Sequence, residues 1–183
     1  MQERAPYQRE GGPRASAPGA KVVRTLPRMA LLANDTAALR LRLELVQRER
    51  AAPGRVLASA AVEHLDRGDL EHWPLVRLPP LWLAPGLAEA LADGVDALVR
   101  GDAPGFSWQA GEGAPLGLQV ARTPDAPGGI QVEFGADLSR FLEEVAGPPA
   151  RPGGELALFR FGTTQAALVV FGASLRTELG ALG

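Results

Sequence analysis

Residues 39–45 read Leu-Arg-Leu-Arg-Leu-Glu-Leu, and this short stretch decides the class of fold. Leucine, arginine and glutamate are good helix formers, so composition alone favours a helix here. The alternation argues against a helix, because a period of two places all four leucines on one face of a strand and would spread them around a helix. We therefore predict a strand with one apolar and one polar face.

The segments that follow predict more strands. Ala51-Ala52-Pro53-Gly54 breaks the first one, and residues 55–64 resume an extended run. Residues 70–83 contain three prolines, which cannot donate to a sheet ladder, so any strand there is an edge strand or an irregular extended segment. Alternating apolar residues predict further strands around three groups: Phe106 and Trp108; Leu116, Leu118 and Val120; Ile130, Val132 and Phe134.

Helical spacing of apolar residues predicts two helices. The first begins near Pro85 and ends at Gly101, and the second begins near Asp137, a good N-cap residue, and ends at Gly147. The apolar stripe of the first helix consists of Leu87, Leu91, Val95 and Leu98.

Two runs near the end of the chain are apolar on both faces. They cover residues 156–161 and 166–171, and such runs are typical of central strands. Residues 162–165 then form the hairpin connection between them, and Ser174 is expected to cap a short final helical turn.

This order of elements predicts an α+β fold. Runs of strands joined by short connections indicate a mainly antiparallel sheet, with two or three helices packed on one side. Residues 1–20 mix proline, glycine, serine, alanine and basic residues without apolar periodicity, so we expect a disordered basic tail. Residues 21–183 are then expected to form a single α+β domain.

Composition excludes several classes of function. The chain has 183 residues, a formal net charge of −2 and no cysteine, so disulfides, thiolate zinc sites and catalytic thiols are excluded. The charge provides no global attraction for nucleic acid or an anionic membrane, and no apolar run is long enough to span a bilayer. We expect a cytoplasmic protein with no cofactor, no nucleic-acid partner and no membrane partner.

No catalytic motif is present, because none of the serines lies in Gly-x-Ser-x-Gly and the glycine pairs lack the residues of a phosphate-binding loop. The most polar cluster, residues 63–73, holds His64 and His72 among four carboxylates. A hairpin that joined the two histidines would create a divalent-metal site, although Asp and Gly also suit an ordinary solvated turn. A metal-dependent protein or hydrolase that uses His64, His72 and the flanking carboxylates is therefore the alternative to a non-enzymatic binding function.

Residues 70–83 also carry apolar bulk without a matching periodic element. Trp73 lies there beside His72, and Asp69 and Glu71 make the preceding turn acidic. An exposed aromatic at the end of an acidic turn is suited to anchor a basic partner surface. We predict Trp73, His72, Glu71 and Asp69 as partner-binding residues; the alternative is that the segment packs over the first helix.

The other two tryptophans are predicted core residues. Trp82 stands between two leucines, and Trp108 shares its strand face with Phe106. Tryptophan buries a large apolar area, so both positions favour burial.

Several features from Leu87 onward occur together in a known family. They are a helix ending Leu98-Val99-Arg100-Gly101, then Phe106-x-Trp108, Glu112 before Leu116-x-Leu118-x-Val120, and Phe134-x-x-Asp137-Leu138 leading to Phe141-Leu142. In this respect the chain resembles the WapI-like bacterial immunity proteins and neighbouring small domains of unknown function, although the usual Glu-Pro is replaced by Glu112-Gly113-Ala114-Pro115. The resemblance implies a cytosolic immunity-type protein that neutralises a toxin by binding it, and it identifies no contact residue.

Overall fold

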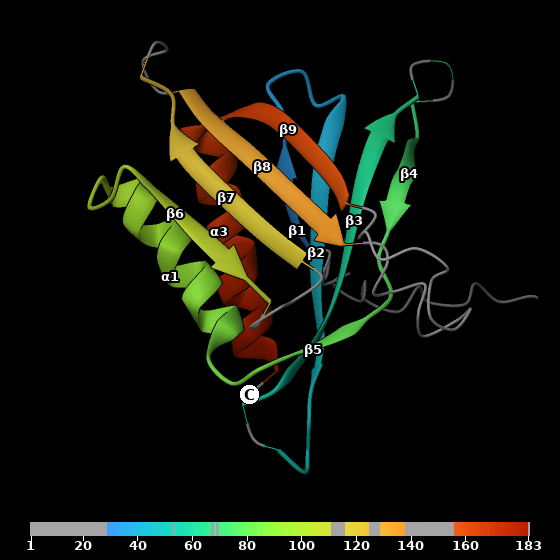
Figure 1. Cartoon of the computed structure of the whole chain (residues 1–183), viewed down its shortest axis with the longest axis vertical. Helices are drawn as coiled ribbons and strands as arrows, with labels where there is room; N and C mark the ends of the chain where they lie inside the picture. Colours follow the sequence, from blue (N-terminus) through green and yellow to red (C-terminus); the bar gives the residue numbers. More distant parts are fainter. Residues whose placement is uncertain are drawn as a thin grey trace, which may run out of the picture.

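The computed structural model describes residues 29–52, 54–66, 68, 70–110, 116–124, 129–137 and 156–182. Within these residues the chain forms nine strands and two helices (Figure 1). Each half of the chain consists of antiparallel strands followed by one helix. The predicted tail at residues 1–20 lies outside the described residues, and so does the predicted second helix beyond Asp137.

The first sheet contains the stretch that decided the fold class. Its strands pair antiparallel in the order β1-β2-β3-β4, and β5 joins β3 along the same edge as β4. Prolines 79 and 80 separate β4 from β5, because proline has no N–H for the ladder. The predicted strands at residues 39–45 and 55–64 are confirmed. The strands are β1 (Ala30–Ala33), β2 (Leu39–Arg48), β3 (Val56–Leu65), β4 (His72–Arg77) and β5 (Leu81–Leu83).

The first predicted helix is confirmed as α1 (Leu87–Arg100). Gly86 and Gly101 flank it with φ angles of 80° and 84°, a left-handed conformation that glycine adopts without steric cost. The N–H of Gly101 donates to the carbonyl of Leu98 and closes the last turn. The buried stripe of α1 includes the predicted residues Leu91, Val95 and Leu98.

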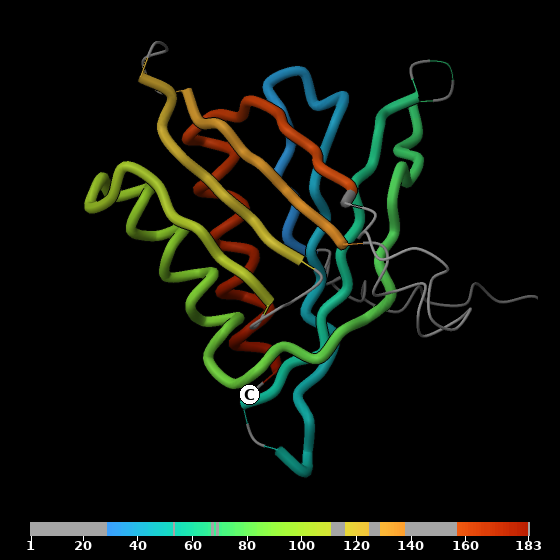
Figure 2. Tube along the Cα trace, in the orientation of Figure 1, coloured from blue at the N-terminus to red at the C-terminus, as the bar shows by residue number. Residues whose placement is uncertain are grey.

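The second sheet is built from the later alternating segments. Its strands pair antiparallel in the order β6-β7-β8-β9, and α3 (Gln165–Ala181) follows β9 directly. Figure 2 shows the chain turning back from β9 into this helix. The strands are β6 (Gly105–Gln109), β7 (Leu116–Arg122), β8 (Gly129–Asp137) and β9 (Leu156–Thr164).

The two helices are exchanged between the sheets. α1 follows the first sheet in sequence but packs on β6, whereas α3 follows the second sheet but packs on β1 and β2. The helices also pack on each other, and Figure 1 shows them side by side with the second sheet crossing in front of α3. One cluster of buried apolar side chains therefore joins both sheets and both helices.

The prediction of a strand at residues 166–171 is wrong, because these residues belong to α3. The run is apolar on both sides, and short apolar runs of this kind do not distinguish a buried strand from a buried helix. The hydroxyl of Thr164 accepts a hydrogen bond from the N–H of Ala167 and caps the helix at its start. Ser174 consequently lies inside the helix and caps nothing.

The predicted class, α+β with antiparallel strands, is confirmed. The strands form two sheets rather than one, and each sheet turns its apolar face toward the helices. β9 was expected in the centre of a sheet but lies at an edge, where Leu158 is half exposed.

Gly172 marks a close approach of α3 to α1. A Cβ at this position would lie 2.8 Å from Cγ1 of Val95, a buried β-branched residue with one strongly preferred rotamer in a helix. Gly180 lies in the same helix, and a Cβ there would meet nothing within 4 Å. The two glycines therefore make a matched pair for testing the helix contact.

Gly172→Ala should lower the free energy of unfolding by about 1–3 kcal/mol, because the helices must move apart to admit a methyl group. Gly180→Ala should leave it unchanged or raise it by up to about 1 kcal/mol, since alanine is the better helix former. Chemical denaturation of both variants and the wild type measures the difference. Equal effects of the two substitutions would contradict the close packing of α1 on α3.

Candidate nucleic-acid interface

The outer face of the first sheet carries basic and aromatic side chains. In β3, Val56, Ala58, Ala60 and Val62 are buried toward the core, so the alternate residues face outwards. Residues directly opposite each other on antiparallel strands share a face. The register Arg42↔Ala61↔Arg77, together with Arg40↔Glu63 and Leu57↔Trp82, defines what we call the arginine face: Arg40, Arg42, Arg77 and Trp82, with Arg55 above Trp82.

A single carboxylate organises two of these arginines. Nε of Arg40 lies 2.7 Å from Oε2 of Glu63, and Nε of Arg42 lies 3.3 Å from Oε1 of the same residue. Glu63 is only 4% exposed, and a buried carboxylate is tolerated where charged partners compensate it. Because two guanidinium groups share one carboxylate, the three side chains together carry one net positive charge.

Arg77 extends this positive charge across the sheet. It lies on edge strand β4, is exposed, and is separated from Arg42 by Ala61 of β3. Among the described residues, Arg77 has no ion-pair partner. Its guanidinium is therefore available to an anion.

Trp82 supplies an aromatic surface on the same face. The prediction that it is a core residue is wrong, because its strand pairing with Leu57 turns it outwards and leaves it 36% exposed. The guanidinium carbon of Arg55 lies 5.6 Å from the centre of the ring, within the range of a cation–π contact. Trp108 is buried as predicted, and its indole N–H donates to the carbonyl of Leu87 at 2.8 Å.

The predicted partner-binding residues Trp73, His72 and Glu71 lie at or next to the beginning of β4. Trp73 is 56% exposed, which agrees with the interpretation that part of this apolar bulk stays outside the core. A ring nitrogen of His72 lies 3.2 Å from the carbonyl oxygen of Ala37, whereas Asp69 lies outside the described residues. Glu71 precedes β4. Their role in contacting a partner stays a prediction.

The two histidines do not assemble a metal site. β3 and β4 are neighbours, as a hairpin requires, but His64 is opposite Trp73 while His72 is opposite Leu65. Consecutive residues of a strand alternate between faces, so the two imidazoles lie on opposite sides of the sheet. Within the described ranges no three His, Cys, Asp or Glu side chains are placed to hold a metal ion. This arrangement does not support the alternative of a metal-dependent protein or hydrolase.

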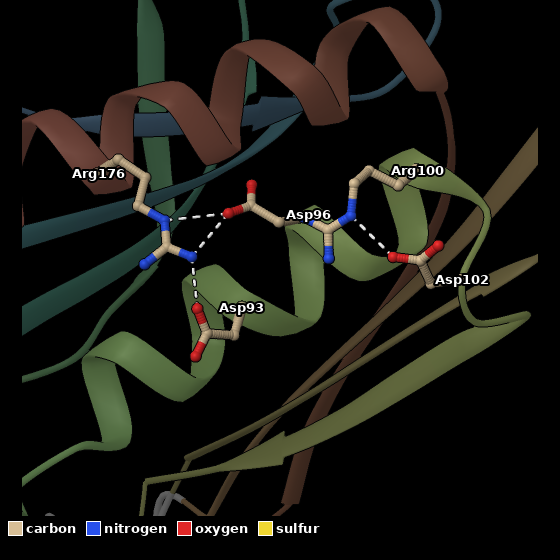
Figure 3. A network of polar contacts seen from close by, with 5 residues as sticks. All are labelled: Asp93, Asp96, Arg100, Asp102 and Arg176. Carbon is tan, nitrogen blue, oxygen red and sulfur yellow. Dashed lines mark hydrogen bonds and ion pairs between the residues drawn. The ribbon is translucent and has the colours of Figure 1, made fainter.

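A different ion-pair network lies on the helices. Arg176 of α3 reaches Asp93 and Asp96 of α1, and Arg100 pairs with Asp102 at 2.7 Å (Figure 3). The hydrogen bonds that Arg176 donates to Asp93 and then to Asp96 raise the pKa of Arg176 further. Both guanidinium groups in Figure 3 face carboxylates, and the ion pairs of Arg176 connect α3 to α1.

Glu178 is a buried carboxyl group where α3 meets β2. It is 4% exposed, and its Oε2 accepts a hydrogen bond from the N–H of Leu45 at 2.7 Å. Burial raises the pKa of Glu178 to about 7 although the N–H of Leu45 opposes the rise, and the charge of nearby Glu44 adds to it. β1 begins at Ala30, opposite Leu43, and the carboxyl group of Glu178 accepts from the N–H of Leu45, two residues further along β2.

No protein-family model and no curated protein matches this chain. Among solved structures it is similar to the MRP1/MRP2 proteins of Trypanosoma brucei, with 14% identity, 86% of each chain covered and a TM-score of 0.47. It is also similar to a guide-RNA-binding protein complex bound to a gRNA, with 13% identity, 85% of this chain and 92% of the other covered, and a TM-score of 0.46. At these scores the likeness by itself assigns no function. The resemblance to WapI-like proteins stays a prediction.

Two predictions made from the sequence differ from what these neighbours are. An immunity-type domain with a protein partner and no nucleic-acid partner does not agree with a neighbour that is a guide-RNA-binding complex bound to RNA. We set that function aside. In the part of the chain that the structure describes, no helix is long and apolar enough to cross a membrane.

Sequence reasoning missed the arginine face although its signal was present. Arg40 and Arg42 alternate with the leucines of β2 and therefore had to share the polar face of that strand. What the sequence did not contain was the register that brings Arg77 and Trp82 onto the same face. For Arg77, this register depends on an irregularity in the β3–β4 pairing between Val62↔Val76 and Glu63↔Pro74, where β4 has one extra residue.

Glu178→Gln should flatten the dependence of stability on pH. Because the pKa of Glu178 rises from 4.5 to about 7 on folding, the native state binds the proton more tightly and loses stability as pH increases between these values. The full loss of unfolding free energy across this pH range is of the order of 3 kcal/mol. The stability of Glu178→Gln relative to the wild type should therefore increase from pH 5 to pH 8 in urea denaturation. A constant difference across this range would show that the folded protein does not favour the protonated carboxyl.

Proposed function

We propose that this chain binds single-stranded nucleic acid on the arginine face. The observation that carries the proposal is that Arg40 and Arg42 of β2 and Arg77 of β4 lie on one face of the sheet, with Trp82 and Arg55 on the same face. Cations that follow a phosphate backbone and aromatic rings on which bases stack are the two elements of single-strand binding surfaces.

The arginines suit phosphate recognition by their chemistry and by their spacing. A guanidinium group is planar, stays charged and offers several N–H donors to phosphate oxygens. Neighbouring strands of a sheet lie about 4.8 Å apart, so Arg42 and Arg77, two strands apart, are about 10 Å from each other at the backbone. Long side chains on this spacing can contact successive phosphates of an extended strand.

Trp82 supports binding of the bases themselves. Nucleobases stack on indole rings and on guanidinium planes. Trp82 and Arg55 provide one of each, with the guanidinium carbon 5.6 Å from the centre of the ring. Such stacking tolerates every base, because each base has a π face. The arginine face by itself is therefore expected to bind without strong sequence preference.

The net charge of −2 sets a limit on the affinity. Electrostatic attraction of the nucleic acid must come from the surplus of positive charge on the arginine face, since the chain as a whole weakly repels a polyanion. Binding is therefore expected at low ionic strength and should weaken as salt competes for the phosphates. A cytoplasmic location stays a prediction of the sequence.

Arg77→Ala should weaken binding of a labelled single-stranded oligonucleotide about tenfold at low salt, because it removes one charged phosphate contact. The slope of log K against log salt should become less steep by about 0.7, the contribution of one phosphate on a single strand. Fluorescence anisotropy with RNA and DNA versions of one sequence measures both quantities.

Arg100→Ala is the matched control, since it removes the same charge from an exposed site on α1 that already pairs with Asp102. It should leave both affinity and salt slope close to those of the wild type. Trp82→Ala should also weaken binding, with little change of the salt slope, because stacking is not a counterion effect. If Arg77→Ala and Arg100→Ala behave alike, the arginine face is not the binding surface.

A further inference from the structure

The outer face of the second sheet is different in character from the arginine face. It contains a shallow depression of about 160 Å³, lined by Gln119, Ala121, Gln131, Glu133 and Arg160. The register explains why this surface is hollow. Gly105, Ala121, Gln131 and Gly162 form one row across the four strands, and Ser107, Gln119, Glu133 and Arg160 form the next. The surface is depressed along the first row because three of its four residues have a side chain of one carbon or none.

The hydrogen-bonding groups around the depression are only partly used. Arg160 donates to Oε2 of Glu133 through Nε at 2.9 Å and through Nη2. Gln131 makes one long hydrogen bond, with its Nε2 3.5 Å from the carbonyl oxygen of Phe161. The amide of Gln119 has no hydrogen-bond partner among the described residues. Hydrogen-bond donors and acceptors from three strands therefore surround a small apolar surface, and some of them remain able to bind a ligand.

The charges select the class of ligand. Glu133 and Arg160 neutralise each other, so no surplus cation is present to attract a phosphate. A neutral, planar molecule with alternating donors and acceptors fits such a lining better than an anion does. Glutamine amides match the N6 and N7 edge of adenine, and an arginine fork matches O6 and N7 of guanine. Both of these edges belong to purines.

We propose that this depression binds the edge of a purine base and gives the protein a preference for purine-containing strands. The proposal rests on the proposed function in one respect, since a bound strand is the expected source of the base; a free purine nucleotide offers the same chemistry. Gln119 is the central residue, because its amide has no hydrogen-bond partner in the part of the chain that the structure describes and because it lies between Ser107 and Glu133 in the register.

Gln119→Ala tests the proposal, with Gln109→Ala as the matched control. Gln109 is an exposed glutamine on the outer face of the same sheet, at the end of edge strand β6, and does not line the depression. The measurement is the ratio of Kd values for oligo-U and oligo-A of equal length. The wild type should prefer oligo-A, and Gln119→Ala should reduce the preference by about 5-fold to 100-fold, as expected for the loss of one bidentate base contact. Gln109→Ala should leave the ratio unchanged.

Three features separate this proposal from simple stacking and from the proposed function. Adenine also stacks better than uracil, so a preference that survives in Gln119→Ala belongs to Trp82 and overturns the purine site. Arg77→Ala should weaken oligo-A and oligo-U equally and leave the ratio intact. Affinity for oligo-U and the salt slope should be the same in Gln119→Ala and the wild type.

The source of the base is resolved by titrating AMP while following the side-chain amide signals of Gln119 and Gln131 by NMR. Shifts with AMP as well as oligo-A indicate a site that also accepts a free nucleotide, whereas shifts with oligo-A alone indicate recognition within a strand. Shifts with AMP in a protein that binds no oligonucleotide would support the purine site and refute nucleic-acid binding. No shift with either ligand, or no base preference in the wild type, overturns the purine site.

Discussion

The packing of α3 against α1 is the contact on which the rest of the structure depends. Each sheet has one apolar face. α3, which follows the second sheet, packs on β1 and β2 of the first, and α1, which follows the first sheet, packs on β6 of the second. Gly172 permits the close approach of the helices, since a side chain there would meet Val95. The hydroxyl of Thr163 adds a hydrogen bond to the carbonyl of Ala33 and links β9 to β1. Neither half of the chain can therefore bury its own apolar face without the other.

This exchange of helices leaves both outer sheet faces for function. Period-two alternation fixes their composition, because every residue that does not face the core faces away from it. The first sheet thereby presents guanidinium groups and an indole, and the second presents amides and a neutral ion pair. The two surfaces have complementary chemistry for one ligand, phosphates and stacked bases on the first and base edges on the second.

Net charge is a poor guide to the proposed function. The chain is acidic overall, yet Arg40, Arg42 and Arg77 share one sheet face with only two carboxylates of the described strands, Glu44 and Glu63. A long-range field depends on total charge, but contact with a phosphate depends on the few groups within a Debye length of about 10 Å. The distribution of charge over the folded surface therefore carries information that the sum does not.

The sequence by itself determined the strands of residues 39–45 and 55–64, the helix at residues 87–100 and the α+β class, because periodicity and caps are local properties. Only the tertiary structure decided that residues 166–171 are helical, since an apolar run on both faces fits either a strand or a buried helix. The candidate sites followed the same division. Alternation placed Arg40 and Arg42 on one face of β2, but the register of distant strands set Arg77 beside them, separated His64 from His72 and brought Gln119 and Gln131 together. Strand register depends on which strands pair, and a one-residue shift such as the one in the β3–β4 pairing moves side chains to the other face of the sheet.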